Sequence, residues 1–265
     1  MYQTQFVRGE FLERVESSPQ SLLMLDYDGT LAPFHEHRDS AKPYRGVPEL
    51  LSQIMATPTR VVVVSGRSAA EVSRLLALDP LPEIWGAHGL ERLRPDNTLI
   101  VGRVDRRSKY AIDQALEWAR SEDCESRMER KPGGVALHWR GLELARREEL
   151  YQSALTAFLP LTRVSRLSLS EFDGGIELRV ANCNKGHVVN ELLREMGEVP
   201  AAYLGDDRTD EDAFRSLQGR GLTVLVRSQL RPTTAELWLQ PPDELILFLK
   251  DWLRAASTRK HAAAD

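Results

Sequence analysis

The sequence predicts an α/β fold built on a parallel sheet, with a second, smaller α/β module inserted into the chain. Short apolar runs alternate with segments whose apolar residues recur at helical spacing, which is the pattern of repeated βαβ units. This rhythm stops between about residues 104 and 183, where alternating apolar and polar residues predict antiparallel strands. We therefore expect a core formed by residues 1–103 and 184–265 and an inserted module formed by residues 104–183.

Five short apolar runs predict the buried strands of the core: residues 22–25, 61–64, 83–87, 201–204 and 222–226. Four segments between them have apolar residues at helical spacing: residues 46–57, 68–78, 186–196 and 209–218. Right-handed crossover connections place such helices on both faces of a parallel sheet. We expect a sheet that is covered on both sides.

Composition and charge exclude several classes of partner. The chain has 265 residues, with 35 basic and 39 acidic side chains, and it has no long basic block that would suit a nucleic acid. No apolar run approaches the ~20 residues needed to cross a bilayer. Cys124 and Cys183 lack metal-ligand spacing, and the first residues lack an apolar signal core. These features predict a cytoplasmic protein whose partner is neither a nucleic acid nor a membrane.

The inserted segment is predicted to contain two helix-strand-strand units, with strand turns at residues 131–134 and 173–175. Apolar and polar residues alternate in GGVALHWRG and in GGIELRV, so one face of this sheet is apolar and the other is charged. We expect the apolar face to pack under the two helices and the open face to carry Glu129, Lys131, His138, Arg140, Glu177 and Arg179. A solvated surface is the usual outcome for such a face. This mixture of carboxylate, ammonium and guanidinium groups also suits the hydroxyl and phosphate groups of a sugar phosphate.

Acidic residues follow two of the buried runs. Asp26 and Asp28 end the stretch LLMLDYD, and because side chains alternate along an extended chain, both should project to the same side. The stretch AAYLGDDRTD ends in Asp206, Asp207 and Asp210. The carboxyl ends of parallel strands form the ligand site of open α/β sheets, and carboxylates there suit Mg²⁺. An isolated acid in such a turn is often only a helix cap, and that interpretation stays open for Asp207.

Two further stretches supply groups that can bind a phosphoryl oxygen. VVVVSGRS ends a buried run in Ser65 and Gly66, which offer a hydroxyl and free N–H groups at a helix start, although an ordinary capped turn is the alternative. NKGH places Lys185 just before a helix, where an ammonium group could neutralise the charge of a transferring phosphoryl group.

In this order, DYDGT, SG, the later lysine and GDDRTD resemble the four motifs of the haloacid dehalogenase (HAD) superfamily of phosphatases. More narrowly, DYDGTLAPF, VSGR, GAHGLE, ERKPGGVALHWR, IELR and GDDRTDEDAF are similar to trehalose-6-phosphate phosphatases, over most of the chain. The resemblance implies a HAD-like Rossmannoid core with a C2-type α/β cap. It also implies Mg²⁺-dependent hydrolysis of trehalose 6-phosphate through an aspartyl-phosphate intermediate.

The resemblance implies a role for each matching residue. Asp26 is the implied nucleophile, and Asp28 would protonate the leaving oxygen and then activate the hydrolytic water. The implied catalytic set is Asp26, Asp28, Thr30, Ser65 and Lys185. The implied Mg²⁺ ligands are Asp26, the backbone carbonyl of Asp28, Asp206, and either Asp207 or Asp210, directly or through water. The implied substrate-binding set is Gly66, Arg67, His88, Glu129, Lys131, Arg140 and Glu177, although His88 in its Gly-rich loop could equally be structural.

Three alternatives remain. A related phosphatase for sucrose phosphate or a glycosyl-phosphoglycerate would share the core motifs and differ in the cap, and a sugar-phosphate mutase is also conceivable. A regulatory module that partners a trehalose-6-phosphate synthase would have lost Asp26, Asp28, Lys185 or Asp206, and all four are present. The expected ligand is a small sugar phosphate, with a functional link to a trehalose-6-phosphate synthase.

Overall fold

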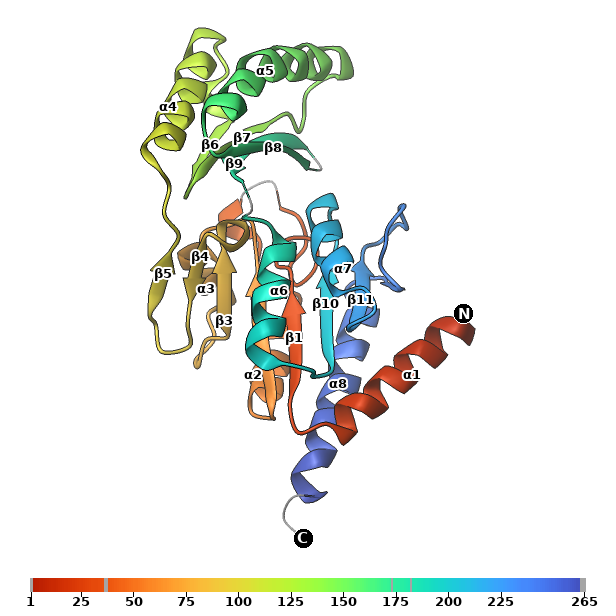
Figure 1. Ribbon diagram of the computed structural model, residues 1–265. Coiled ribbons are helices and arrows are strands. Elements are labelled where there is room, and N and C mark those ends of the chain that lie inside the picture. Colours follow the sequence, from red (N-terminus) through yellow and green to blue (C-terminus); the bar gives the residue numbers. More distant parts are fainter. Residues whose placement is uncertain (1, 36–37, 173, 182, 263–265) are drawn as a thin grey trace. The chain divides into compact units, whose positions relative to one another are not determined.

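The computed structural model describes residues 2–35, 38–172, 174–181 and 183–262 (Figure 1). The chain divides into two compact units, Met1–Ile100 with Lys185–Asp265 and Val101–Asn184, which are called the core and the inserted module below. Within the described residues, no helix is both long enough and apolar enough to cross a membrane.

The described residues of the core form a sheet of eight strands, in the order β12-β11-β10-β1-β2-β3-β4-β5. The strands are β1 (Ser21–Leu25), β2 (Thr59–Val64), β3 (Glu83–Gly86), β4 (Glu91–Leu93), β5 (Leu99–Val101), β10 (Ala201–Gly205), β11 (Leu222–Val226) and β12 (Leu237–Leu239). From β12 to β3 neighbouring strands are parallel, whereas β4 is antiparallel to β3. Leu25 at the end of β1 is in register with Leu204 of β10 and Val63 of β2, so these three strands end at the same level.

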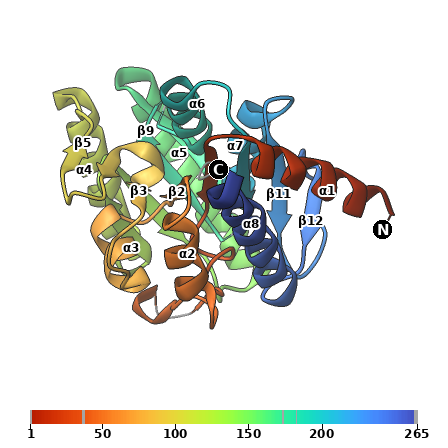
Figure 2. The same cartoon turned by 90° about the horizontal axis from the view of Figure 1, so that it is seen from below.

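Helices cover both faces of this sheet. One face packs against α1 (Tyr2–Ser17), α2 (Val47–Met55), α3 (Ala69–Leu76) and α8 (Asp243–Ala262), and the other against α6 (Lys185–Met196) and α7 (Glu211–Leu217). Figure 2 shows α2, α3 and α8 on one side of the sheet and α6 and α7 on the other. Because both faces are buried, β1 and β2 have continuous apolar sequences, and the predicted α/β core is confirmed.

Several elements of the core go beyond the sequence prediction. The apolar runs predict neither the short strands β4, β5 and β12 nor the helices α1 and α8. Helix α1 packs on α8 through Phe11, whose ring centroid lies 5.8 Å from that of Trp252. Arg8 and Asp251 add an ion pair between the two helices. This contact depends on a helix far away in the sequence, so local periodicity gives no signal for it.

The inserted module has an antiparallel sheet in the order β6-β7-β9-β8. Its elements follow the predicted helix-strand-strand order: α4 (Arg106–Ser121), β6 (Met128–Lys131), β7 (Gly134–His138), α5 (Leu144–Val164), β8 (Leu167–Phe172) and β9 (Gly175–Val180). Val135, Leu137, Ile176 and Leu178 form a buried cluster with residues of α4 and α5, so the predicted apolar face packs under the two helices (Figure 1). In the predicted turn at 173–175, residue 173 lies outside the described residues.

Candidate active site

Three buried carboxylates meet where β1 and β10 end. Asp26 follows β1, Asp206 follows β10, and Asp210 closes the short helix η4 (Arg208–Asp210). One oxygen from each carboxylate lies within 4.8 Å of the others, and all three residues are buried. The N–H of Asp26 donates to the carbonyl of Leu204 at 2.8 Å, which continues the ladder between the two strands and fixes their ends side by side.

Lys185 is the buried cation among these carboxylates. It is the first residue of α6, and its Nζ lies 2.7 Å from Asp26 Oδ1 and 2.7 Å from Asp210 Oδ1. Burial alone would lower the pKa of Lys185, but the two carboxylates outweigh burial and raise it. The lysine therefore carries its charge at neutral pH, and its two ion pairs connect Asp26 after β1 with Asp210 after β10.

One lysine does not balance three buried carboxylates. Burial is the largest cause that raises the pKa of Asp26, which reaches about 7 despite the opposing charge of Lys185, with Asp210 and Asp28 adding to the increase. Burial, then Asp26 and Asp210, also raise the pKa of Asp206 well above its ordinary value. Among the described residues, Asp206 Oδ1 is a buried oxygen without a hydrogen-bond partner. Hard carboxylate oxygens with excess negative charge fit a divalent cation such as Mg²⁺.

Both carboxylate oxygens of Asp210 accept hydrogen bonds that hold the turn after β10. Its Oδ1 accepts hydrogen bonds from Lys185 Nζ and from the Tyr203 hydroxyl, both at 2.7 Å. Its Oδ2 accepts from the N–H groups of Asp206 at 3.1 Å and Asp207 at 2.9 Å. Asp207 caps η4 by accepting from the N–H of Arg208 at 2.6 Å, and it lies outside the group of three carboxylates.

Asp28 points to a different partner from Asp26. The guanidinium of Arg67 donates to Asp28 Oδ2 through Nε and to Oδ1 through Nη2, both at 2.7 Å, which is a bidentate ion pair. The extended conformation ends at Leu25, and the chain turns through Tyr27 to a bridge between Asp28 and Ala32. Asp28 is not one of the three converging carboxylates, although its charge contributes to the raised pKa of Asp26.

The turn after β2 lies beside the loop that carries His88. The N–H of His88 donates to the carbonyl of Ser65 at 2.9 Å, and a Cβ on Gly66 would lie 2.7 Å from His88 Nε2. Ser65 Oγ is buried and accepts from the N–H of Arg67 at 3.1 Å. Thr30 Oγ1 is buried and, within the part of the chain that the structure describes, has no hydrogen-bond partner. Such a hydroxyl is available to a phosphoryl oxygen.

Comparisons with known proteins agree with this geometry. Residues 24–242 match the family model described as Trehalose-phosphatase. The chain belongs to the trehalose-phosphatase family. The resemblance to trehalose-6-phosphate phosphatases that the motifs indicate is thereby confirmed.

Individual relatives of the trehalose-phosphatase family match most of the chain. Trehalose-phosphate phosphatase B of Arabidopsis thaliana is 27% identical over 264 residues, which covers 89% of this chain and 67% of that protein. The bifunctional trehalose-6-phosphate synthase/phosphatase of Thermoproteus tenax is 31% identical over 207 residues, which covers 77% of this chain and 28% of that protein. The solved C-terminal domain of C. albicans trehalose-6-phosphate phosphatase has a TM-score of 0.80 at 20% identity, covering 93% of this chain and 96% of that one, which shows a shared fold.

Three residues of the inserted module that are predicted to bind the sugar lie on the polar face of its sheet: Glu129, Lys131 and Glu177. Glu129 and Glu177 flank Ala136 in the register of β6, β7 and β9. Lys131 Nζ lies 3.1 Å from Glu177 Oε1, and His138 Nε2 lies 2.8 Å from Glu129 Oε2. These side chains thus form two pairs, Lys131 with Glu177 and His138 with Glu129, and the two glutamates flank Ala136.

Arg140 lies just after β7 and is exposed. A Cβ on Gly174 would lie 2.5 Å from Arg140 Nε, so this glycine leaves room for the guanidinium.

Two residues that form hydrogen bonds to the acidic residues of this site are not evident from the sequence. Tyr203 lies in the apolar run AAYL and looks like an ordinary core residue, yet its hydroxyl binds Asp210. Arg231 lies in a loop without any motif, yet it donates to the backbone of Asp206 and Asp207. The Tyr in a strand that ends in acids is a weak signal, whereas Arg231 has none.

Gly29→Ala is expected to damage the site sterically. Gly29 has φ of 80°, and a Cβ there would lie 2.2 Å from Asp206 Oδ2, so a methyl group must displace that carboxylate. A displacement of ~1 Å at reacting groups can cost about 10²-fold in rate, and we expect a loss of about this size in kcat/KM for phosphate ester hydrolysis. The control is Gly46→Ala, since Gly46 has φ of 90° and open space around it. Equal activities of the two variants would contradict the close packing of Gly29 on Asp206.

Proposed function

We propose that the protein hydrolyses trehalose 6-phosphate to trehalose and phosphate, with Mg²⁺ as its cofactor. The observation that carries this proposal is the buried cluster of Asp26, Asp206, Asp210 and Lys185 at the ends of β1 and β10, in a chain of the trehalose-phosphatase family. The names of its relatives support the substrate. The free thiols Cys124 and Cys183 support a reducing, cytoplasmic location.

Asp26 is the proposed nucleophile. Its carboxylate attacks phosphorus in line with the ester oxygen, the bond between phosphorus and that oxygen breaks, and an aspartyl-phosphate forms. Lys185 holds Asp26 Oδ1 at 2.7 Å and so fixes the carboxylate for the attack. Water then attacks the phosphorus of the aspartyl-phosphate and releases inorganic phosphate and free Asp26. Thr30 and Ser65 are the proposed hydroxyl donors to the phosphoryl oxygens.

Asp28 is the proposed acid and base. As an acid it gives a proton to the departing sugar oxygen, and as a carboxylate it later takes a proton from the attacking water. The two hydrogen bonds from Arg67 hold the plane of the Asp28 carboxylate. Arg67 also belongs, with Gly66 and His88, to the proposed substrate-binding residues of the core.

A Mg²⁺ ion would be held by the carboxylates of Asp26 and Asp206 and by the backbone carbonyl of Asp28. The unpartnered Oδ1 of Asp206, noted among the described residues, supports this donor set. Asp210 binds Lys185 and two N–H groups, so we propose that it places the ligands, with any approach of Asp207 or Asp210 to the ion through water. When bound, the ion supplies positive charge that offsets the repulsion between the carboxylates and the phosphate.

We propose that the polar face of the inserted module recognises the sugar. Glu129 and Glu177 can accept hydrogen bonds from sugar hydroxyls, while Lys131 and Arg140 can donate to sugar oxygens. The fused synthase/phosphatase relative supports a functional link to a trehalose-6-phosphate synthase.

Phosphate release from a panel of esters tests this function. The panel is trehalose 6-phosphate, sucrose 6-phosphate, glucose 6-phosphate and a glycosyl-phosphoglycerate, each with Mg²⁺ and with a chelator. We expect kcat/KM for trehalose 6-phosphate to exceed the others by at least about tenfold, and chelation to abolish turnover. Preference for another ester would keep the core chemistry and overturn the sugar assignment. Turnover of no ester would instead favour a regulatory module.

The pKa of Asp26 predicts how the metal-free protein responds to pH. A carboxyl whose pKa is raised on folding stabilises the fold below its ordinary pKa of 3.8, and that contribution is lost as the pH rises through about 7. We therefore expect the free energy of unfolding in chelator to fall more steeply between about pH 4 and pH 7 in wild type than in Asp26→Asn, which lacks the titrating carboxyl. Mg²⁺ at pH 8 should restore stability, since the ion replaces the proton. The free energy of unfolding is measured by denaturant titration at each pH. An equal dependence of this free energy on pH in the two proteins would contradict the prediction.

A further inference from the structure

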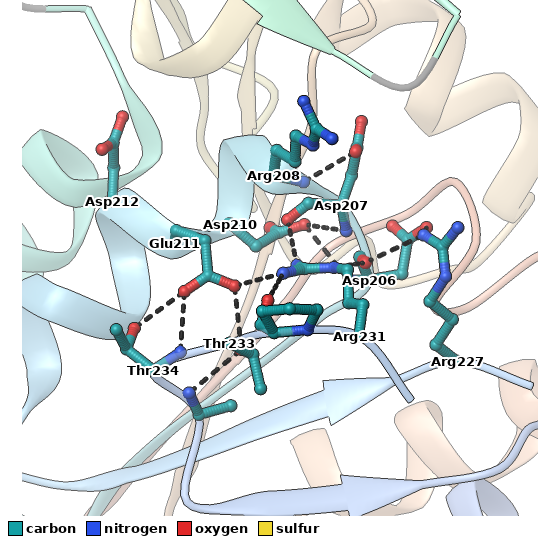
Figure 3. Close-up of polar contacts among 12 residues, drawn as sticks. Asp206, Asp207, Arg208, Asp210, Glu211, Asp212, Arg227, Arg231, Thr233 and Thr234 are labelled. Atoms are coloured by element: carbon teal, nitrogen blue, oxygen red, sulfur yellow. Dashed lines mark hydrogen bonds and ion pairs between the residues drawn. The ribbon is translucent and has the colours of Figure 1, made fainter. Parts of the chain in front are cut away.

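The loop from β11 to β12, residues 227–236, contacts the turn that carries Asp206. Figure 3 shows Arg231 lying across this turn. Its Nε donates to the carbonyl oxygen of Asp206 at 3.2 Å, and its Nη2 donates to the carbonyl oxygen of Asp207 at 2.7 Å. One guanidinium therefore bridges two consecutive peptide carbonyls directly after β10.

The same two residues are held from the opposite edge by Asp210. Asp210 Oδ2 accepts from both of their N–H groups, so the N–H and the C=O of Asp206 and of Asp207 are all hydrogen-bonded. Arg227 Nη1 adds a longer contact of 3.4 Å to the carbonyl of Asp206 and lies 4.0 Å from Asp206 Oδ2. The backbone from which the Asp206 side chain extends is thus fixed by separate parts of the chain.

Arg231 is itself fixed by Glu211, the first residue of α7. The carboxylate of Glu211 accepts from Arg231 Nη1, from the hydroxyls of Thr233 and Thr234 at 2.8 Å, and from the N–H of Thr234 at 2.9 Å (Figure 3). Arg231 Nη1 also donates to the carbonyl of Pro232 at 2.8 Å. Burial alone would raise the pKa of Glu211, but these hydrogen bonds, led by the N–H of Thr234, lower it, so Glu211 stays charged.

We propose that Arg231 is a positioning residue for the cation site, because its guanidinium fixes the backbone that aims the Asp206 carboxylate. This inference rests on the proposed function, in which Asp206 holds Mg²⁺. Within the described part of the chain no hydrogen bond holds Asp206 Oδ1, so the position of the Asp206 backbone contributes directly to the direction of this oxygen. A planar guanidinium presents N–H groups from separate nitrogens to two neighbouring carbonyls in a fixed geometry, which the single ammonium nitrogen of a lysine does not reproduce.

Arg231→Lys tests this role, because it keeps the positive charge and removes the pair of guanidinium hydrogen bonds to the carbonyls of Asp206 and Asp207. Mg²⁺ binding to the full chain is measured by titration calorimetry without substrate, beside unfolding in chelator. Residues that orient metal ligands typically change metal affinity by about 10- to 100-fold, so we expect the Kd for Mg²⁺ to rise about tenfold. The matched control is Arg215→Lys on α7, where the guanidinium forms an exposed ion pair of 2.7 Å with Asp212, and we expect no change in Kd.

The outcomes separate this inference from the function on which it rests. A folded Arg231→Lys protein that binds Mg²⁺ as tightly as wild type and Arg215→Lys would overturn the role of Arg231 alone. A wild-type protein that binds no Mg²⁺ would overturn the cation-dependent function and this inference together. If wild type binds Mg²⁺ but hydrolyses no ester, the proposed function fails while the affinity comparison still decides the role of Arg231.

Glu211→Gln keeps the test decisive if Arg231→Lys does not fold. Glutamine retains an oxygen acceptor for Arg231 but removes the charge that holds it, at a cost typical of a charged hydrogen bond. An increase in the Kd for Mg²⁺ of at least about threefold supports the inference. An unchanged Kd in folded Glu211→Gln protein overturns it.

Discussion

Replacement of Asp26 by asparagine is expected to lower kcat for trehalose 6-phosphate by at least about 10⁴-fold, since loss of a nucleophile removes the covalent route. The amide cannot attack phosphorus to give the aspartyl-phosphate. Lys185 keeps its second partner, Asp210 at 2.7 Å, so the surrounding contacts survive the change. Steady-state phosphate release measures the effect.

The same variant is expected to stay folded without metal. Because burial raises the pKa of Asp26 to about 7, its charge opposes folding near neutral pH, and its removal should not lower the unfolding midpoint in chelator. Asp39→Asn is the control, as Asp39 forms an exposed ion pair with Arg74. Near-normal turnover by Asp26→Asn would refute the nucleophile, and turnover lost equally in Asp39→Asn would point to a nonspecific effect.

Lys185→Met is expected to have the largest effect on stability. Methionine keeps the length of the side chain, but the ammonium that lies 2.7 Å from both Asp26 and Asp210 is lost. Removal of one partner from a buried charge pair typically costs about 3–5 kcal/mol, and we expect a loss of this size at pH 8 in chelator. Turnover should fall as well, because Lys185 orients the nucleophile.

The loss of stability in Lys185→Met should depend on the pH and on the presence of Mg²⁺. At pH 5 it should be smaller, because a carboxyl such as Asp26, whose pKa is already raised to about 7, takes up a proton there. Mg²⁺ should restore part of the stability at pH 8 by supplying the missing charge. The control is Arg194→Met on the same helix, which removes an exposed ion pair with Glu191 and should change stability by less than about 0.5 kcal/mol. Equal losses in the two variants, measured by denaturant titration, would contradict the role given to Lys185.

The sequence predicts most of the core sheet for a simple physical reason. Strands buried on both faces have continuous apolar sequences, as in residues 22–25 and 61–64, and the turns after them carry the polar groups. Since parallel strands end at one edge, the meeting of Asp26 with Asp206 also follows from sequence order. Helix α1 has no such signal, because its packing partner α8 lies at the other end of the chain.

The sequence predicts the finer geometry of the site less well, because it depends on contacts between distant segments. Alternation along a strand predicts that Asp26 and Asp28 project together, but it does not predict that Asp28 pairs with Arg67 and lies outside the group of three carboxylates. Arg231 reaches Asp206 only because the loop from β11 to β12 returns to the end of β10. No spacing rule links those two positions.

The central claim, that Asp26 accepts the phosphoryl group of trehalose 6-phosphate, is tested most directly by rapid acid quench and peptide mass spectrometry. The protein is mixed with trehalose 6-phosphate and Mg²⁺ and quenched within the first turnover, with Asp26→Asn as the control. We expect one added phosphoryl group on the wild-type peptide that contains Asp26, and none on the variant. Complete turnover with no phosphorylated peptide, or with the phosphoryl group on another residue, would contradict the account.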